Sequence, residues 1–181
     1  ILARYRPEEV RYFILTSHYR SPLNYDDEHL DNARAALARL YTALRGLPEA
    51  PPAGGEAFRE RFHAAMDDDF NTPVALSVLF DLAREINRVR PQDEAAAAGL
   101  GAELRGLGSI LGLLQADPEA YLRGEGRSAG LGDGEIAALI AERLAARRAK
   151  DWARADRIRA ELAAAGVILE DGPGGTTWRR G

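Results

Sequence analysis

The sequence contains no cysteine, which excludes disulfide bonds and every metal site that needs a thiolate ligand. It also lacks a long apolar run of the kind that crosses a membrane. β-Branched residues are sparse, whereas alanine, leucine, arginine and glutamate dominate, and this composition favours helices. A chain of 181 residues can hold one sizeable domain, or a domain with a small appendage. We therefore expect a mainly α protein that resides in the cytoplasm.

Amphipathic patterns at helical spacing recur along the first two thirds of the chain. One helix is expected to start at Pro7, because proline suits a first helical turn and two acids follow it. Further helices are expected in YDDEHLDNARAALARLYTALRGL, FRERFHAAM, NTPVALSVLFDLAREINRV and DEAAAAGLGAELRGLGSILGLL. The loops between these segments are short, so the pattern predicts an antiparallel helical bundle.

A glycine-rich segment, RGEGRSAGLGDGE, is the clearest linker in the chain. After it, one helix carries an apolar face from Ile136 to Leu144, and Asp151 can cap a second helix that runs to Gly166. The runs VILED and TTWRR flank GPGG and predict a β-hairpin. We therefore expect a small α/β module of two helices and a hairpin after the bundle. The predicted divisions are a first helix with its connector at residues 1–22, the bundle at 23–122, the linker at 123–134 and the module at 135–181.

Three consecutive aspartates, Asp67 to Asp69, invite a metal-binding interpretation, but helix chemistry explains their surroundings better. Asn71 or Thr72 can cap the helix that follows, and Pro73 suits its first turn. The acids lack the alternating ligands and the late glutamate of a calcium loop. We therefore expect these acids to be structural and predict no metal site.

Charge is distributed unevenly along the chain. The formal net charge is −4, yet the residues from Glu142 onward include nine basic and six acidic side chains, a net charge of +3. A protein that touches a polyanion only at chosen places has this distribution.

The helix that begins near Trp152 carries an unusual combination of side chains. On a helical wheel Ala155, Ile158 and Leu162 form the buried face, and Trp152 lies at its edge beside Asp156 and Arg159. The indole can simply cover the rim of the module. Alternatively it is a stacking platform for an unstacked base, with carboxylates accepting hydrogen bonds from a base edge. The second interpretation suits single-stranded RNA and not duplex DNA. Trp178, in the second strand, is predicted to pack the hairpin onto the helices.

Three long segments closely resemble, in the correct order, the C-terminal part of bacterial cysteinyl-tRNA synthetases. They are SHYRSPLNYDDEHLDNARAALARLYTALRGL, MDDDFNTPVALSVLFDLAREINR and AKDWARADRIRAELAAAGVILEDGPGGTTWRR. The resemblance implies a stem-contact helix, a DALR-like anticodon-binding bundle and an anticodon-recognition module. PEEVRYF stands in the place of the D-A-x-x-R-like motif, of which Arg11 is retained. We therefore expect Ile1 to lie inside a longer protein, so no signal peptide can be read.

The resemblance also implies what the intact protein does. Such class I enzymes activate cysteine with ATP and attach it to tRNA(Cys) for translation, using a catalytic domain with HIGH and KMSKS signatures and a zinc ion. Neither signature is present here. We therefore expect a fragment that is inactive alone and holds no catalytic residue, metal or cofactor, with ATP and Zn²⁺ belonging to the missing domain. The expected partner is tRNA(Cys), at its anticodon loop and inner stem, with no DNA and no membrane. The intact enzyme is expected to be monomeric.

Residue roles follow from the same resemblance. Arg147, Trp152, Asp156 and Asp171 occupy the positions that approach the GCA anticodon. Contacts to the tRNA backbone are expected from Arg20, Arg179 and Arg180. Independently of the resemblance, His18 is expected to be a structural hydrogen-bonding residue, because it is a lone histidine just before a helix break.

Two alternatives remain open at this point. One is the paralogous cysteine ligase of mycothiol synthesis, which has a similar bundle but is not expected to carry the tryptophan helix or the EDGPGGTTW hairpin. The other is a non-catalytic helical module that binds another protein.

Overall fold

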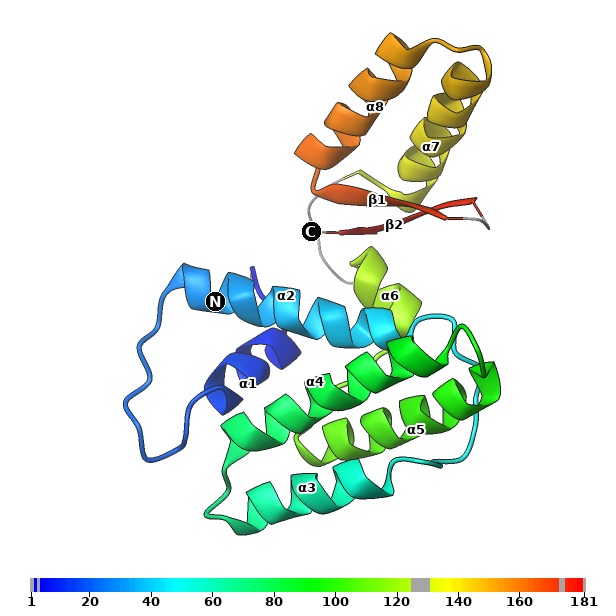
Figure 1. Ribbon diagram of the computed structural model, residues 1–181. Helices are drawn as coiled ribbons and strands as arrows, with labels where there is room; N and C mark the ends of the chain where they lie inside the picture. Colours follow the sequence, from blue (N-terminus) through cyan, green and yellow to red (C-terminus); the bar gives the residue numbers. More distant parts are fainter. Residues whose placement is uncertain (1, 3, 125–130, 173–174, 181) are drawn as a thin grey trace. The chain divides into compact units, whose positions relative to one another are not determined.

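The computed structural model describes residues 2, 4–124, 131–172 and 175–180. Within them lie eight helices and one two-stranded sheet, which form two compact units at residues 1–118 and 119–181 (Figure 1). The prediction of a mainly α fold is confirmed. No helix among the described residues has the length and apolar character needed to cross a membrane.

The first unit is a bundle of five helices. They are α1 (Pro7–Leu15), α2 (Asp27–Leu44), α3 (Glu56–Asp67), α4 (Thr72–Val89) and α5 (Glu94–Ile110). Three of these helices begin at a side-chain cap that accepts a hydrogen bond from a backbone N–H. The pairs are Asp26 with His29, Asn71 with Val74 and Asp93 with Ala96. Asn71 rather than Thr72 is therefore the cap of α4.

The core of the bundle forms around α4, which packs against α2, α3 and α5. Its fully buried members come from all of these helices and include Leu37, Leu40, Phe62, Leu79, Leu82, Ile86 and Leu104. A polar network closes the end of the bundle between α1 and the segment after α5. The Tyr41 hydroxyl and the Leu114 N–H donate to the carboxylate of Glu8, and the Ala116 N–H donates to the Tyr41 hydroxyl.

Arg11 joins the same two segments. Its guanidinium donates to the Gly112 carbonyl at 2.7 Å. Gly112 has φ +68°, and a Cβ there would lie 3.0 Å from Arg11 Nη1, so a glycine permits this close approach. Arg11 therefore stabilises the bundle by holding α1 against the end of α5.

The acidic segment before α4 has a structural role. Asp69 accepts a hydrogen bond from the Tyr19 hydroxyl at 2.7 Å and pairs with Arg20 at 3.0 Å. His18 lies 3.8 Å from the same carboxylate, and its Nδ1 accepts from the Arg20 N–H. Across the part of the chain that the structure describes, no three acidic or histidine side chains are grouped so that they could hold a metal ion.

The second unit contains α7 (Asp133–Arg148), α8 (Trp152–Ala164) and a hairpin of β1 (Val167–Gly172) and β2 (Gly175–Arg180), preceded by the short α6 (Pro118–Arg123). The strands are antiparallel, with Leu169 opposite Trp178 and Asp171 opposite Thr176. The predicted hairpin is thus confirmed, although Pro173 and Gly174 of its turn lie outside the described residues. So do residues 125–130 of the predicted linker.

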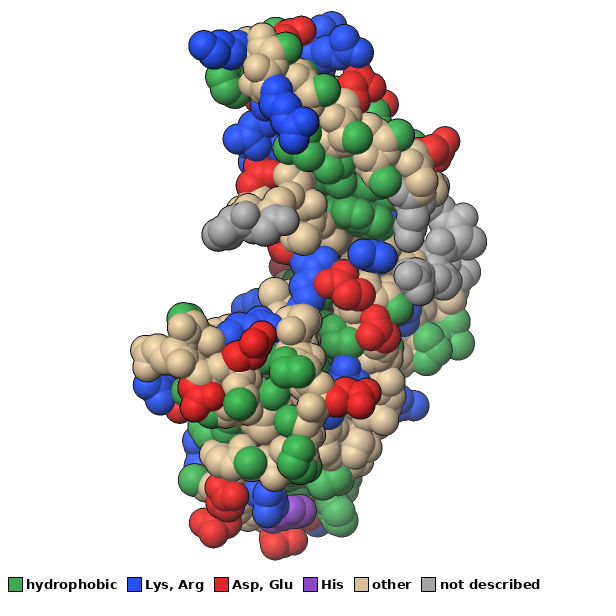
Figure 2. Space-filling model, turned by 90° about the vertical axis from the view of Figure 1, so that its right-hand side faces the viewer, with side chains coloured by type: hydrophobic (Ala, Val, Ile, Leu, Met, Phe, Trp, Pro, Cys, Tyr) green, Lys and Arg blue, Asp and Glu red, His purple; other side chains and the backbone are tan. Residues whose placement is uncertain are grey.

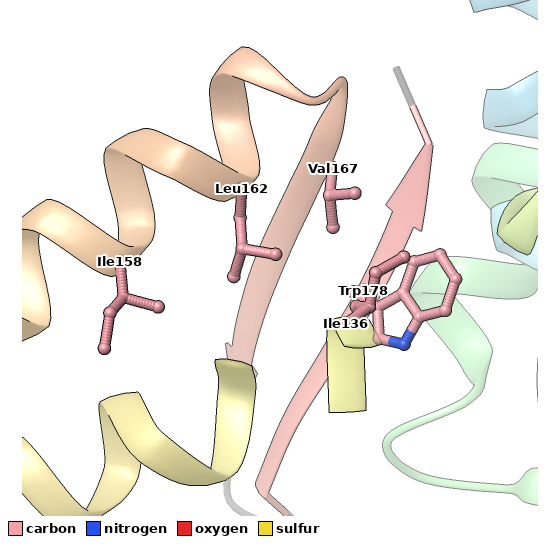
Figure 3. Close-up of a cluster of buried hydrophobic side chains, with 5 residues drawn as sticks. All are labelled: Ile136, Ile158, Leu162, Val167 and Trp178. Carbon is pink, nitrogen blue, oxygen red and sulfur yellow. The ribbon is translucent and has the colours of Figure 1, made fainter. Parts of the chain in front are cut away.

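A small hydrophobic core holds the hairpin to the two helices (Figure 3). It consists of Ile136 from α7, Ile158 and Leu162 from α8, Val167 from β1 and Trp178 from β2. Figure 3 shows that these side chains come from both helices and from both strands of the hairpin. Trp178 is 9% exposed, which confirms the prediction that it packs the hairpin onto the helices.

Candidate nucleic-acid interface

Trp152 is the first residue of α8, and its position follows from how that helix begins. Asp151 caps the helix by accepting a hydrogen bond from the Arg154 N–H at 3.1 Å. The buried face then starts at Ala155 and continues through Ile158 and Leu162. Trp152 lies at the edge of this face and is 59% exposed. Most of the indole is therefore open to solvent, as a stacking platform requires.

Asp156 follows Trp152 by one helical turn and is also exposed. Residues four apart on a helix are neighbours on its surface, so the indole and this carboxylate share one face of α8. Asp156 also lies close enough to Arg143 of α7 to help raise the pKa of that guanidinium. The carboxylate thus shares a helix face with the exposed indole and lies near a buried positive charge.

Asp171 of β1 is the most strongly bound of the predicted residues. Arg143 donates to both of its carboxylate oxygens, at 3.1 Å and 2.8 Å, and the Thr176 hydroxyl donates at 2.6 Å. These hydrogen bonds, chiefly the one from Arg143, hold the pKa of Asp171 well below its usual range. The side chain is nevertheless 46% exposed, so a ligand can reach it.

Arg147 stands one turn after Arg143 on α7. Its guanidinium reaches the same carboxylate of Asp171, but at 3.4 Å, and its side chain is 43% exposed. The structure thus brings Arg147 and Asp171 together across the interface between α7 and the hairpin.

The three arginines predicted to contact the tRNA backbone all have partners within the chain. Arg179 donates to Glu170 across the hairpin, and Arg180 donates to the carbonyl oxygens of Arg123 and Leu131. Arg180 also stacks over the ring of Trp178. Arg20 belongs to the first unit, where it pairs with Asp69.

Basic side chains gather over the end of the second unit at which α7 and α8 meet (Figure 2). Exposed basic residues at this end of the two helices are Arg147, Arg148, Lys150 and Arg154. Arg154 pairs with Glu142 of the neighbouring helix. The charge asymmetry of the sequence therefore becomes a local basic surface, suited to a phosphate backbone.

Sequence reasoning missed the part played by Arg143, which entered only as one of nine basic residues. Its side chain is 7% exposed, and it is the centre of the hydrogen bonds around Asp171. Its spacing of four from Arg147 places both on one face of α7, but nothing local shows that Asp171 lies opposite. Thr176 was missed for the same reason.

Models of two protein families match separate stretches of the chain. A DALR domain matches residues 61–115, and a cysteinyl-tRNA ligase anticodon binding domain matches residues 131–179. Three similar proteins are the cysteine–tRNA ligases of Thioalkalivibrio sulfidiphilus, Methylococcus capsulatus and Pseudomonas aeruginosa. The T. sulfidiphilus enzyme is 68% identical over 100% of this chain and 39% of its own length. The M. capsulatus enzyme is 63% identical over 99% of this chain and 40% of its own length, and the P. aeruginosa enzyme is 58% identical over 99% of this chain and 39% of its own length.

The chain belongs to the cysteine–tRNA ligase family. It spans about two fifths of the length of these relatives and corresponds to their C-terminal part. The anticodon-binding match includes the four residues predicted to approach the bases, whereas the DALR match begins after PEEVRYF. The comparisons support the ligase interpretation and neither of the two alternatives.

Proposed function

We propose that this chain is the tRNA-binding part of a cysteine–tRNA ligase and that residues 135–181 read the GCA anticodon of tRNA(Cys). One observation supports the proposal. The stretch that matches an anticodon-binding domain is also the stretch in which an exposed indole, two carboxylates and a basic surface occur together. Residues 1–22 and 23–122 would then be the stem-contact helix with its connector and the supporting bundle.

The chemistry of these side chains suits bases that leave the stack in a loop. The exposed face of Trp152 can stack on one base, a contact worth about 1–3 kcal/mol. Asp156 and Asp171 can accept hydrogen bonds from the N–H groups of guanine and cytosine edges. Arg147 of α7, Arg179 and Arg180 of β2, and Arg20 of the first unit can then contact phosphates of the RNA backbone.

The intact ligase activates cysteine with ATP and transfers it to tRNA(Cys), and this part supplies recognition. The donor groups of the chain do not fit a zinc site, since it has no cysteine and its described acids and histidines form no metal-holding group. Together with the resemblance to class I synthetases, this leads us to assign Zn²⁺, ATP and all catalytic residues to the rest of the enzyme. We also propose a cytoplasmic, monomeric enzyme that binds neither DNA nor membranes.

A binding measurement tests recognition directly. An RNA hairpin with the anticodon stem and GCA loop of tRNA(Cys) should bind the chain more tightly than the same stem with an unrelated loop. Footprinting on the whole tRNA should show protection at the anticodon loop and inner stem. Equal affinity for both hairpins, or protection elsewhere alone, would contradict the proposal.

A second measurement uses the intact enzyme. Trp152→Ala and Asp156→Ala should slow the charging of tRNA(Cys) while cysteine-dependent ATP–pyrophosphate exchange continues at the normal rate. An equal loss of both reactions would argue against a role confined to recognition. The 181-residue chain alone should show no exchange.

A further inference from the structure

Arg143 differs from the other basic residues of α7 because it is buried at the interface with the hairpin. Its two terminal nitrogens each donate to a different oxygen of Asp171, in the paired geometry that fixes the plane of a carboxylate. Asp156 adds a second negative charge near the same guanidinium. The side chain therefore lies close to both carboxylates that we propose to read bases.

The hydrogen bonds to Asp171 leave it little free capacity. A carboxylate accepts about four hydrogen bonds, two at each oxygen. Here Oδ1 accepts from Arg143 and Thr176, and Oδ2 accepts from Arg143 and Arg147. A base can approach this carboxylate only if one of the four donors leaves.

The donor that can leave most readily is Arg147. Its bond to Asp171 is the longest of the four, at 3.4 Å, and its side chain is 43% exposed. Arg143 is held by two shorter bonds and by burial, and Thr176 faces Asp171 within the hairpin register. The loss of the Arg147 bond would free one acceptor position on Oδ2 of a carboxylate whose side chain is nearly half exposed.

We propose that Arg143 is a positioning residue for anticodon recognition, which holds the Asp171 carboxylate in place while Arg147 leaves it for the RNA backbone. This proposal rests on the function proposed above. Arg143 itself does not touch the RNA.

The two arginines should therefore fail in different ways when they are changed. Arg143→Lys keeps the positive charge but cannot place two separate nitrogens opposite the two oxygens in one plane, so Asp171 loses its fixed orientation. In this variant the GCA loop should lose about 10-fold to 100-fold of its affinity advantage over the loop in which the base read by Asp171 is replaced. The affinity for that replaced loop itself should not change. Arg147→Met should weaken binding of all loops by a similar factor and leave the preference unchanged.

Two further variants keep the test independent of folding. Thr176→Val removes the hydroxyl donor with little change in shape and should also reduce the preference, less than Arg143→Lys does. Arg123→Lys, which alters the ion pair with Glu119 in the same unit and at a residue with no proposed role in RNA binding, is the matched control and should retain the preference. A carboxyl ¹³C titration should show a higher pKa for Asp171 in Arg143→Lys than in the unaltered chain.

The outcomes separate the two proposals. If the unaltered chain does not distinguish the GCA loop from an unrelated loop, the proposed function is wrong, and the role of Arg143 in it is wrong as well. If the unaltered chain distinguishes them and both Arg143→Lys and Thr176→Val keep the full preference, only the positioning role is overturned. A loss of preference in Arg147→Met equal to that in Arg143→Lys would show that Arg147 does not leave Asp171.

Discussion

The two tryptophans of the chain show how strongly position decides the role of a single residue. Trp152 lies at the edge of the buried face of α8 and is mostly exposed, whereas Trp178 lies in β2 and is almost fully buried. One indole is available to a ligand, and the other supplies a large part of the hydrophobic core of the second unit.

Alanine at these two positions should have opposite effects. Trp152→Ala should weaken binding of the GCA hairpin by about 5-fold to 150-fold, which corresponds to the loss of one stacked base, and should leave the melting temperature unchanged. Trp178→Ala should reduce the free energy of unfolding of the second unit by about 3–5 kcal/mol. Titration with the GCA RNA hairpin measures the binding, and calorimetry measures the stability of each variant. A large drop in melting temperature for Trp152→Ala would mean that its indole is structural.

Asp171 gives the second unit a dependence on acid. Its pKa is lowered in the folded state, chiefly by Arg143, so its ion pair stabilises the unit fully above about pH 4, the ordinary value for aspartate. That stability should be lost as the pH falls further toward the lowered pKa. Urea denaturation at pH 6 and pH 3 should show a smaller decrease for Asp171→Asn than for the unaltered chain. An equal decrease in the free energy of unfolding for both proteins would show that the ion pair does not contribute to stability.

At the scale of an element, α5 contains glycines with very different surroundings. A Cβ on Gly101 would lie 2.6 Å from Cδ1 of Leu47, a half-buried residue in the loop after α2, whereas a Cβ on Gly106 would meet nothing within 4 Å. Both glycines lie in the interior of the same helix, where alanine is intrinsically favoured over glycine. The two positions therefore separate helix propensity from packing.

Alanine substitutions at these sites should change stability in opposite directions. Gly106→Ala should raise the free energy of unfolding of the bundle by about 0.5–1 kcal/mol. Gly101→Ala should lower it by about 1–3 kcal/mol, because the new methyl group displaces Leu47. Chemical denaturation followed by far-ultraviolet circular dichroism measures both. Stabilisation by Gly101→Ala would show that the Leu47 side chain moves aside at little cost.

The junction between α1 and the segment after α5 depends on a buried hydroxyl. Tyr41→Phe removes a donor to Glu8 and the acceptor of the Ala116 N–H, so it should destabilise the bundle by about 1–3 kcal/mol. Tyr25→Phe removes the same group from an exposed ring and should cause no measurable change. Urea midpoints of the two variants provide the comparison, and equal midpoints would contradict the role of the network.

Sequence patterns predicted the elements well because the relevant chemistry is local. The caps at Asn71 and Asp151 act on N–H groups three residues away, and the hairpin follows from two short strand-like runs around glycines. The pairing of Arg143 with Asp171 joins residues 28 apart, and that of Glu8 with Leu114 joins residues 106 apart. Neither has a periodic signal, so the donors around Asp171 were not predictable. The roles of the predicted site residues in RNA binding stay predictions.

At the scale of the whole molecule, a negative net charge coexists with a basic surface where α7 and α8 meet. Binding to RNA should therefore weaken with added salt, but less steeply than for a wholly basic protein. Arg147→Ala should reduce the slope of log affinity against log salt concentration by about 0.7, as expected for one phosphate contact with a single strand. Titrations of the GCA hairpin at several salt concentrations measure this slope. An unchanged slope would mean that Arg147 does not contact phosphate.

Both tryptophans lie in the second unit, and all five phenylalanines lie in the first. Selective excitation of indole fluorescence consequently reports on the second unit alone, without any added dye. Buried Trp178 should shift to longer emission wavelengths when that unit unfolds, while Trp152 should be quenched when a base stacks on it. The chain thus carries separate optical signals for the folding of the module and for its occupation by RNA.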